Sequence, residues 1–247
     1  YQATREESYR EKIEETLHWL QKVIYLPETK CWAGSQDADQ EYYSVSLEQR
    51  RNLKAPYVDK SIYVNWNAQL ADALFLVAAT LQDTAWQQKA LDTLTSLEKL
   101  CYSRKQGYAH YYDGQAAHIY GLLTDQVSVG MALATAFQHT GEKEFLDKSE
   151  RLALWCINKL RSPAGGFYDS LPDPHAVGDL AASLIDLQQN ARTASWLLLL
   201  HSFSESPAFR QEAENTLQAF AGSFEEYGLM ASSYALAVFS ALQPWIK

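Results

Sequence analysis

Two carboxylates separated by one residue form the sharpest chemical feature of the sequence, Asp37 and Asp39 in the segment QDAD. Carboxylates this close repel each other unless a cation, a base or solvent compensates, and the repulsion raises the pKa of one of them. Such a pair can act as the acid and the base of glycoside hydrolysis. It can equally be part of the loop structure, and a D-x-D segment by itself is only a weak indication of a metal site.

Three connecting segments share one pattern, in which a small residue is followed by aromatic residues and then by an acid. The segments are CWAGSQDAD at residues 31–39, GYAHYYD at 107–113 and GGFYD at 165–169. Aromatic rings cover the apolar faces of sugars, while carboxylates accept hydrogen bonds from hydroxyl groups and transfer protons. The pattern favours a polyhydroxylated ligand, and the later loops would contribute Tyr112, Asp113, Tyr168 and Asp169. The structural alternative is a turn with an aromatic plug and an Asp that caps the next element.

Amide side chains recur near the expected starts of three helices, at Asn67, Gln126 and Asn190. Trp66 directly precedes the first amide and Asp125 the second. An amide or carboxylate at such a position either caps the helix or projects into a central cavity, and an indole would lie at the same rim. Both interpretations stay open at the level of sequence.

Several common catalytic motifs are absent from the sequence. The six histidines show no HExxH spacing, which disfavours a zinc enzyme, and the loop histidines His110, His118 and His175 are expected at the solvated surface. Segments of the GxSxG and GxxxxGK types are missing, so serine-nucleophile and nucleotide chemistry have no support. The three cysteines lack CxxC spacing and predict neither a disulfide framework nor a zinc site. We therefore predict no metal site and no cofactor.

Charge and hydrophobicity exclude further classes of protein. The 247 residues include 21 Lys and Arg against 30 Asp and Glu, a net charge of −9, which argues against binding to nucleic acid or to anionic membranes. Apolar runs are far shorter than the ~20 residues of a membrane span. Because unpaired cysteines suit a reducing compartment, we expect a cytoplasmic location.

Helical periodicity dominates the chain, and strand-like alternation is brief and confined to connecting segments. The sequence therefore predicts an all-α protein. The expected helices cover residues 5–25, 62–81, 85–101, 125–139, 143–160, 191–203, 207–221 and 230–242.

Three helix pairs come into register when the chain is aligned on itself at Trp86, Phe145 and Phe209, with a period of about 60 residues. The opening segment matches a second helix of a pair and the closing segment matches a first helix. We therefore expect a chain that begins and ends within a repeat, as a fragment of a longer protein would.

The two helices of each pair differ in polarity. The first is apolar nearly all round, which predicts an inner position, whereas the second alternates apolar and charged stripes. Connections within a pair are short and those between pairs are long, so the long loops must gather at one end. An inner ring of helices wrapped by an outer ring is an α/α toroid, and the alternative is a superhelical solenoid. We predict one toroid-like domain over residues 1–247 that forms an incomplete ring.

The segments SQDAD, YVNWNA, GLLTDQ, GGFYD, QNAR and SYALAV carry a resemblance to a known family. Over most of its length the sequence resembles the helical C-terminal portion of the thioredoxin-domain-containing family that includes spermatogenesis-associated protein 20. This resemblance implies a six-hairpin toroid, similar to those of N-acylglucosamine 2-epimerases and glycosidases, preceded by a thioredoxin-like domain in the longer chain. The site residues that it marks are Gln36, Asp37, Asp39, Trp66, Asn67, Asp125 and Asn190. The thioredoxin cysteine pair is missing from this chain, and the stretch after QDAD departs from the family pattern.

Two functions are compatible with these features. In the first, the loop-bearing face of the toroid binds a carbohydrate-like molecule and carries out hydrolase or epimerase chemistry, with Asp37, Asp39 or Asp125 transferring protons. In the second, the domain is a non-catalytic scaffold that serves a thioredoxin-like domain.

Overall fold

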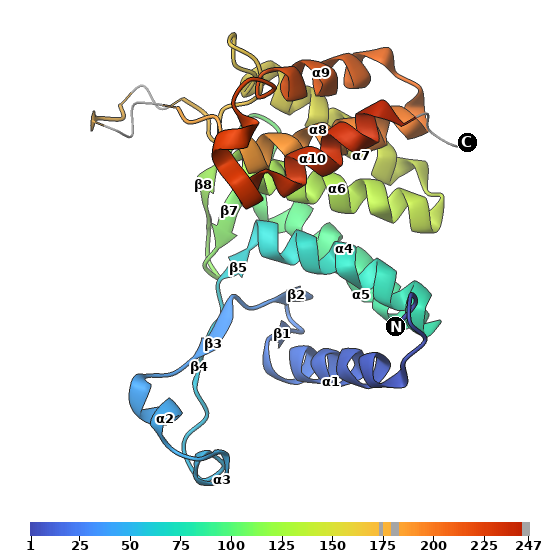
Figure 1. Cartoon of the computed structure of the whole chain (residues 1–247). Helices are drawn as coiled ribbons and strands as arrows, with labels where there is room; N and C mark the ends of the chain where they lie inside the picture. The colour runs from blue at the N-terminus through green and yellow to red at the C-terminus, as the bar shows by residue number, and fades with distance from the viewer. Residues whose placement is uncertain (173–174, 179–182, 244–247) are drawn as a thin grey trace.

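The computed structural model describes residues 1–172, 175–178 and 183–243. Its centre is a row of inner helices, α4 (Val64–Leu81), α6 (Leu123–Thr140), α8 (Leu187–Ser204) and α10 (Ser232–Leu242). Helix α4 packs on α6, α6 on α8 and α8 on α10 (Figure 1). The predicted inner helices are therefore neighbours in space.

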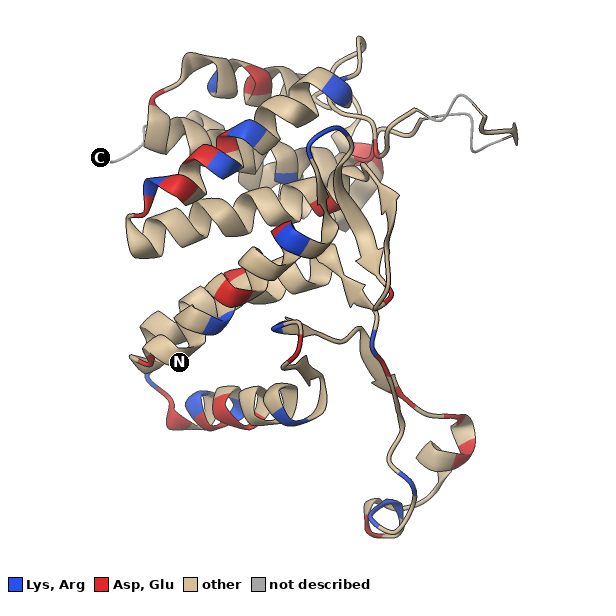
Figure 2. Ribbon diagram, turned by 180° about the vertical axis from the view of Figure 1, so that it is seen from behind, with Lys and Arg blue, Asp and Glu red and all other residues tan. Residues whose placement is uncertain are grey.

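Each of the first three inner helices is followed by an outer helix that packs against it. The outer helices are α5 (Thr84–Cys101), α7 (Lys143–Lys159) and α9 (Pro207–Gln218), and α1 (Glu7–Val23) lies against α4 at one end of the row. Eleven residues of α6 are buried, against five in α7. Charged residues gather on outer helices such as α1 and α7 (Figure 2). The difference in polarity read from the sequence thus gives the correct layers.

The inner helices form an open arc. Helix α1 lies at one end of the row, and α10, which packs on α8, lies at the other (Figure 1). The apolar face of α10 is consequently uncovered in part, and Leu236 and Phe239 are exposed. The prediction of an incomplete ring agrees with this arrangement.

The observed helix boundaries lie within two residues of the predicted ones except at the start of α8 and at the end of α9, which ends at Gln218 and not at residue 221. Helix α8 begins at Leu187, four residues before the predicted start, because the side chain of Asp186 caps it by accepting a hydrogen bond from the Gln189 N–H at 2.7 Å. The last helix begins only at Ser232, since a 3-10 segment η2 (Phe224–Ala231) precedes it and contains Gly228 at a positive φ of 51°.

Small antiparallel sheets lie beside the N-terminal ends of the inner helices, on the face where the long loops gather (Figure 1). The strands β5 (Ile62–Tyr63), β6 (Tyr102–Ser103), β7 (Gly107–Tyr112) and β8 (Ala117–Tyr120) form one sheet, and β1 (Tyr25–Leu26) pairs with β2 (Cys31–Trp32). Within the described residues, every helix falls short of the length and apolar character of a membrane span.

A hairpin projects from the helical body as an extended arm. It consists of β3 (Ser35–Asp37), the short helices α2 (Gln40–Ser44) and α3 (Leu47–Arg50), and the returning strand β4 (Tyr57–Asp59). Both views show the α2 and α3 end of this arm well away from the inner helices (Figures 1 and 2).

The three repeated amides fasten the loops to the inner helices with the same set of hydrogen bonds. Asn67 accepts from the N–H of Trp32 at 2.8 Å and donates to the carbonyls of Trp32 and Tyr63 at 2.9 and 3.0 Å. Gln126 does the same with Tyr108 and Leu122, and Asn190 with Phe167 and Asp186. We call this arrangement the amide clasp. Each clasp satisfies both backbone groups of a buried loop residue.

A glycine precedes the clasped aromatic residue in two of the three repeats. Gly107 and Gly166 have φ values of +77° and +68°. A Cβ at Gly107 would lie 2.6 Å from Oε1 of Gln126, and one at Gly166 would lie 2.8 Å from Oδ1 of Asn190. Only glycine combines this backbone conformation with so close an approach of the amide.

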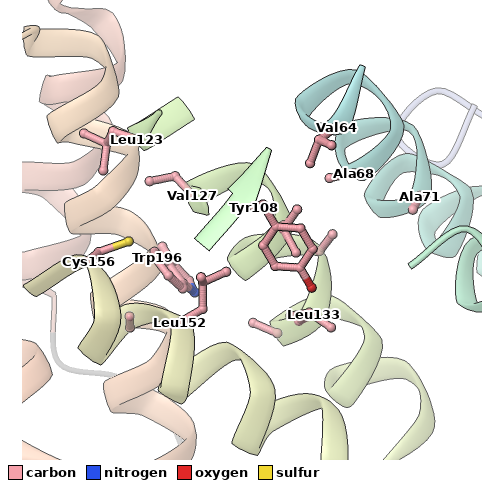
Figure 3. Packing of buried hydrophobic residues seen from close by; sticks show 14 of the residues in the cluster. Val64, Ala68, Ala71, Tyr108, Leu123, Val127, Leu133, Leu152, Cys156 and Trp196 are labelled. Atoms are coloured by element: carbon pink, nitrogen blue, oxygen red, sulfur yellow. The ribbon is translucent and has the colours of Figure 1, made fainter. Parts of the chain in front are cut away.

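The clasped aromatic rings are part of the core. Trp32, Tyr108 and Phe167 are all buried, and Figure 3 shows Tyr108 reaching in toward Leu133. Trp196 lies deeper, donates from Nε1 to Ser149 at 2.9 Å, and leaves room only for a glycine at position 130. The first aromatic residue of each loop pattern is thus the plug that the structural alternative describes.

Replacing Asn190 with Leu should destabilise the fold, because the N–H and carbonyl of Phe167 lose their partner inside the core. The expected loss is about 3 kcal/mol, or roughly 6 to 12 °C in Tm for a domain of this size. Asn158→Leu at an exposed position of α7 is the matched control and should change stability by no more than about 0.5 kcal/mol. Thermal unfolding followed by circular dichroism distinguishes them, and equal Tm values for the two variants would refute a structural role for the clasp.

Candidate functional site

The inner helices begin with a rim of three equivalent positions, each directly before a clasp amide. These positions hold Trp66 on α4, Asp125 on α6 and Gln189 on α8. Trp66 is 53% exposed, whereas the Asp125 carboxyl is fully buried. The Oε1 atom of Gln189 is buried and, among the described residues, lacks a hydrogen-bond partner. The repeat therefore places three different side chains at the N-terminal ends of the inner helices, on the face where the long loops gather.

Asp125 is paired with a histidine from the loop sheet. Nδ1 of His110 lies 3.1 Å from Oδ2 and 3.3 Å from Oδ1 of Asp125. The clasp explains this geometry, because Gln126 holds the backbone of Tyr108 on β7, and residue 110 shares a strand face with residue 108. The His110 side chain is 28% exposed, so the histidine lies between the buried carboxyl and the surface.

The environment shifts both members of the Asp125 and His110 pair. Burial raises the pKa of Asp125, although the His110 ring and the backbone of Asn65 favour its charged form. The hydrogen bond to Asp125 raises the pKa of His110, although partial burial opposes this shift. Both directions favour protonated forms, so the pair holds a proton to higher pH than free histidine and aspartate would.

Aromatic rings lie beside the imidazole of His110. The Tyr63 ring lies 5.8 Å from the imidazole and 4.6 Å from the Trp66 ring, between ring centroids. Tyr111 lies 6.0 Å from Tyr63, and its other side stacks on His118 at 5.0 Å. Together, Tyr63, Trp66 and Tyr111 form an aromatic surface beside the imidazole.

The pair has the composition of a general acid or base. With Nδ1 facing Asp125, Nε2 is the imidazole nitrogen that can meet a ligand, and no described residue hydrogen-bonds to it. A buried carboxylate that orients an imidazole and stabilises its protonated form is a recurrent catalytic arrangement. His110 is therefore the member that can contact a substrate, while Asp125 would act through it.

Asp37, Asp39 and Gln36 lie on the projecting arm and not beside Asp125. Asp37 accepts hydrogen bonds from the Tyr43 hydroxyl and the Ala38 N–H, both at 2.8 Å, and Asp39 caps α2 by accepting from the Tyr42 N–H. The bond from Tyr43 lowers the pKa of Asp37, so the expected raised pKa is wrong for this carboxyl. Gln36 donates to the backbone carbonyl of Pro56 on the arm. Asp37 and Asp39 border an open hollow of about 910 Å³.

Asp113 stabilises the turn between β7 and β8. Its carboxylate accepts from the N–H groups of Gln115 and Ala116, each at 2.8 Å, and from His118 at 2.8 Å. The two backbone bonds are the main reason why the pKa of Asp113 falls to about 2. Tyr112 is the neighbouring residue of β7, half-buried against the core.

Asp169 and Tyr168 form hydrogen bonds that fix the loop between α7 and α8. The carbonyl of Asp169 accepts from the Leu123 N–H at the start of α6, and its carboxylate accepts from the Leu184 N–H at 3.2 Å. Tyr168 donates its N–H to the carbonyl of Leu160. In both later loops the acid thus has structural partners.

Asn67 and Asn190 are almost completely buried, and the clasps use their amides. They support the rim from behind. Of the predicted ligand-binding residues, Trp66 reaches the His110 and Asp125 pair through Tyr63, on which its ring packs.

Sequence reasoning missed His110, whose position was expected to be solvated surface. A usable signal was present, since the strand alternation of GYAHYYD puts residues 108 and 110 on one face, and the amide that faces residue 108 follows Asp125. It also missed Gln189, which stands where the repeat has Trp66 and Asp125. No group of three or more potential metal ligands occurs in the part of the chain that the structure describes.

Comparisons with known proteins agree with the fold. No protein-family model matches the sequence, and a search of curated proteins gives no match. Among solved structures, an unsaturated glucuronyl hydrolase specific for heparin superposes with a TM-score of 0.69 at 13% identity, over 98% of this chain and 70% of that chain. A family 76 glycoside hydrolase from a bovine Bacteroides thetaiotaomicron strain has a TM-score of 0.57 at 14% identity, over 84% and 55%.

A cellobiose 2-epimerase from Spirochaeta thermophila gives a TM-score of 0.60 at 14% identity, over 88% of this chain and 55% of that chain. The chain thus spans about half the length of the glycoside hydrolase and of the epimerase. At these identities the likeness shows the fold, which is an α/α toroid of the six-hairpin glycosidase type, as the sequence predicts.

Replacing Asp125 with Asn should lower the pKa of His110 toward the ordinary histidine value of about 6.5, because the carboxylate that favours the imidazolium is removed. Histidine NMR titration measures this shift directly. A raised pKa in the folded state adds stability that is complete below the ordinary histidine pKa and is lost as pH rises through the raised one. The wild type should therefore lose stability over this pH range and the variant should not. An unchanged His110 titration in the variant would contradict the pairing.

Proposed function

We propose that the loop-bearing end of this toroid binds a carbohydrate and that His110, oriented by Asp125, transfers a proton to or from it. The observation that carries this proposal is the contact at 3.1 Å between a partly exposed imidazole and a fully buried carboxyl. Tyr63 lies beside this imidazole, and the exposed Trp66 packs on Tyr63. The Trp66 indole and the Tyr63 ring would cover the apolar face of the sugar. Asp125 is then a positioning residue, and His110 is the group that reaches the reacting atoms.

Among the proton-transfer reactions of sugars, epimerisation fits the pair better than hydrolysis. Glycoside hydrolysis normally needs two carboxyl groups on either side of the scissile bond. The rim brings one of the three predicted catalytic carboxylates, Asp125, to the partly exposed His110. An imidazole with a raised pKa can remove and return a proton next to a sugar carbonyl at near-neutral pH. The solved structures similar to this chain include sugar epimerases and glycoside hydrolases by name, so both reactions have precedent on the fold.

The arm carboxylates Asp37 and Asp39 remain a candidate for a separate hydrolytic site, because they border their own hollow. The thioredoxin-like domain, the family that the sequence resembles and a cytoplasmic location also remain predictions. None of these is needed for proton transfer at the rim.

The proposal is tested by incubating the protein with aldoses and reducing disaccharides in D₂O and following loss of the C2 proton signal by NMR. Wild type should exchange this proton, and His110→Gln should reduce the rate by about 100-fold or more, the usual contribution of a general acid or base. The pH profile of the wild type should follow the titration of His110.

His118→Gln is the matched control, because His118 is another histidine paired with an aspartate of the same sheet, at 2.8 Å, and should leave exchange unchanged. Exchange that survives in His110→Gln would overturn the proposal. Glycoside cleavage that depends on Asp37 and Asp39, without exchange, would place the chemistry on the arm.

A further inference from the structure

A second layer of equivalent positions lies two residues after each clasp amide. It holds Gln69 on α4, Ser128 on α6 and Arg192 on α8. Nε2 of Gln69 and a terminal guanidinium nitrogen of Arg192 each lie 3.4 Å from the hydroxyl of Ser128. The three neighbouring inner helices therefore meet in one polar cluster, which we call the Gln69 cluster.

Arg192 has more donors than partners in this cluster. A guanidinium carries five N–H donors in a planar fork, yet one long bond, to Ser128, is the side-chain hydrogen bond it makes among the described residues. Among the described residues Arg192 forms no ion pair, although Asp72 on α4 is close enough to attract its charge. Burial lowers the pKa of Arg192, which reports that the cation has given up part of its hydration. Such a cation gains most from an anionic ligand.

The Gln69 cluster lies close to the proton-transfer pair. Ser128 follows Asp125 by three residues on α6, so both side chains share one helix face and their Cα atoms are about 4.5 Å apart along the axis. Gln69 follows Asn65 by four residues on α4, and the backbone of Asn65 contacts Asp125. The two layers are therefore about one helical turn apart along the inner helices.

We propose that Arg192 binds an anionic group of the sugar, a carboxylate or a phosphate, while the ring lies at the rim beside His110. This inference rests on the proposed function for the sugar ring and adds the class of substrate, an acidic sugar. Ser128 and Gln69 would hold the guanidinium and complete the contacts to the anion. The chain has a net charge of −9, so that its overall field repels an anionic ligand. Binding of an acidic sugar therefore needs a local cation such as Arg192.

The test measures binding of D-glucuronate, D-glucose 6-phosphate and D-glucose to the same protein by calorimetry or NMR titration. Wild type should bind at least one of the two acidic sugars about tenfold or more tightly than glucose. Arg192→Met should remove that preference, and Arg192→Lys should restore only part of it, because lysine lacks the planar fork. Arg210→Met, the same change at an exposed ion pair of α9, should bind like the wild type.

The results separate this inference from the proposed function. Preference for acidic sugars that depends on Arg192, without C2 proton exchange, supports the anion site and counts against proton transfer. Equal affinity for glucose and both acidic sugars overturns the anion site even if exchange depends on His110. An Arg192→Met variant that keeps the preference, or a wild type that binds neither acidic sugar, also overturns it. Stronger binding of one acidic sugar identifies carboxylate or phosphate as the anion.

Discussion

The amide clasp is the interaction on which the loop end of this structure depends. An inner helix of a toroid must be apolar on nearly all sides, yet its first turn meets a loop whose backbone needs hydrogen-bond partners. One side-chain amide per repeat resolves this conflict by pairing with the N–H and the carbonyl of the same loop residue. Its third bond, to the carbonyl four residues earlier, fixes the amide to its own helix. The aromatic side chain of the clasped residue then fills the core below.

The clasp also determines where chemistry can occur. With Tyr108 fixed on Gln126, the next residue on the same face of β7 is His110, and the residue before Gln126 is Asp125. The hydrogen bonds of the clasp are thus enough to bring a histidine of the loop and a carboxylate of the helix together. The carboxylate is buried because it is adjacent to the clasp, and that burial raises its pKa. The clasp at Gln126 therefore also positions the His110 and Asp125 pair.

The periodicity of the sequence was sufficient for the helices, their pairing and their layers, because these follow from the distribution of apolar and charged residues. It was insufficient for the loops. The pattern of small residue, aromatic residues and acid indicated a ligand surface, whereas Trp32, Tyr108 and Phe167 are core plugs and Asp113 and Asp169 bind backbone groups. A buried aromatic residue and a ligand-facing one look alike in sequence, and strand pairing across loops decides between them. The outward course of β3 and β4, which separates Asp37 from Asp125, also depends on such pairing.

The repeats keep one scaffold and vary the positions around it. The clasp residue is an amide three times, and its partners are equivalent each time. One residue earlier the chain has Trp66, Asp125 and Gln189, and two residues later it has Gln69, Ser128 and Arg192. At each of these two positions the three side chains differ in charge, size and hydrogen-bonding capacity, although their backbones are related by the same repeat. If these positions had only a structural role, apolar side chains could occupy all of them, since the clasp already supplies the hydrogen bonds that the loop backbone needs. Side chains that vary one residue before and two residues after a constant amide suit a binding surface built on a repeated scaffold.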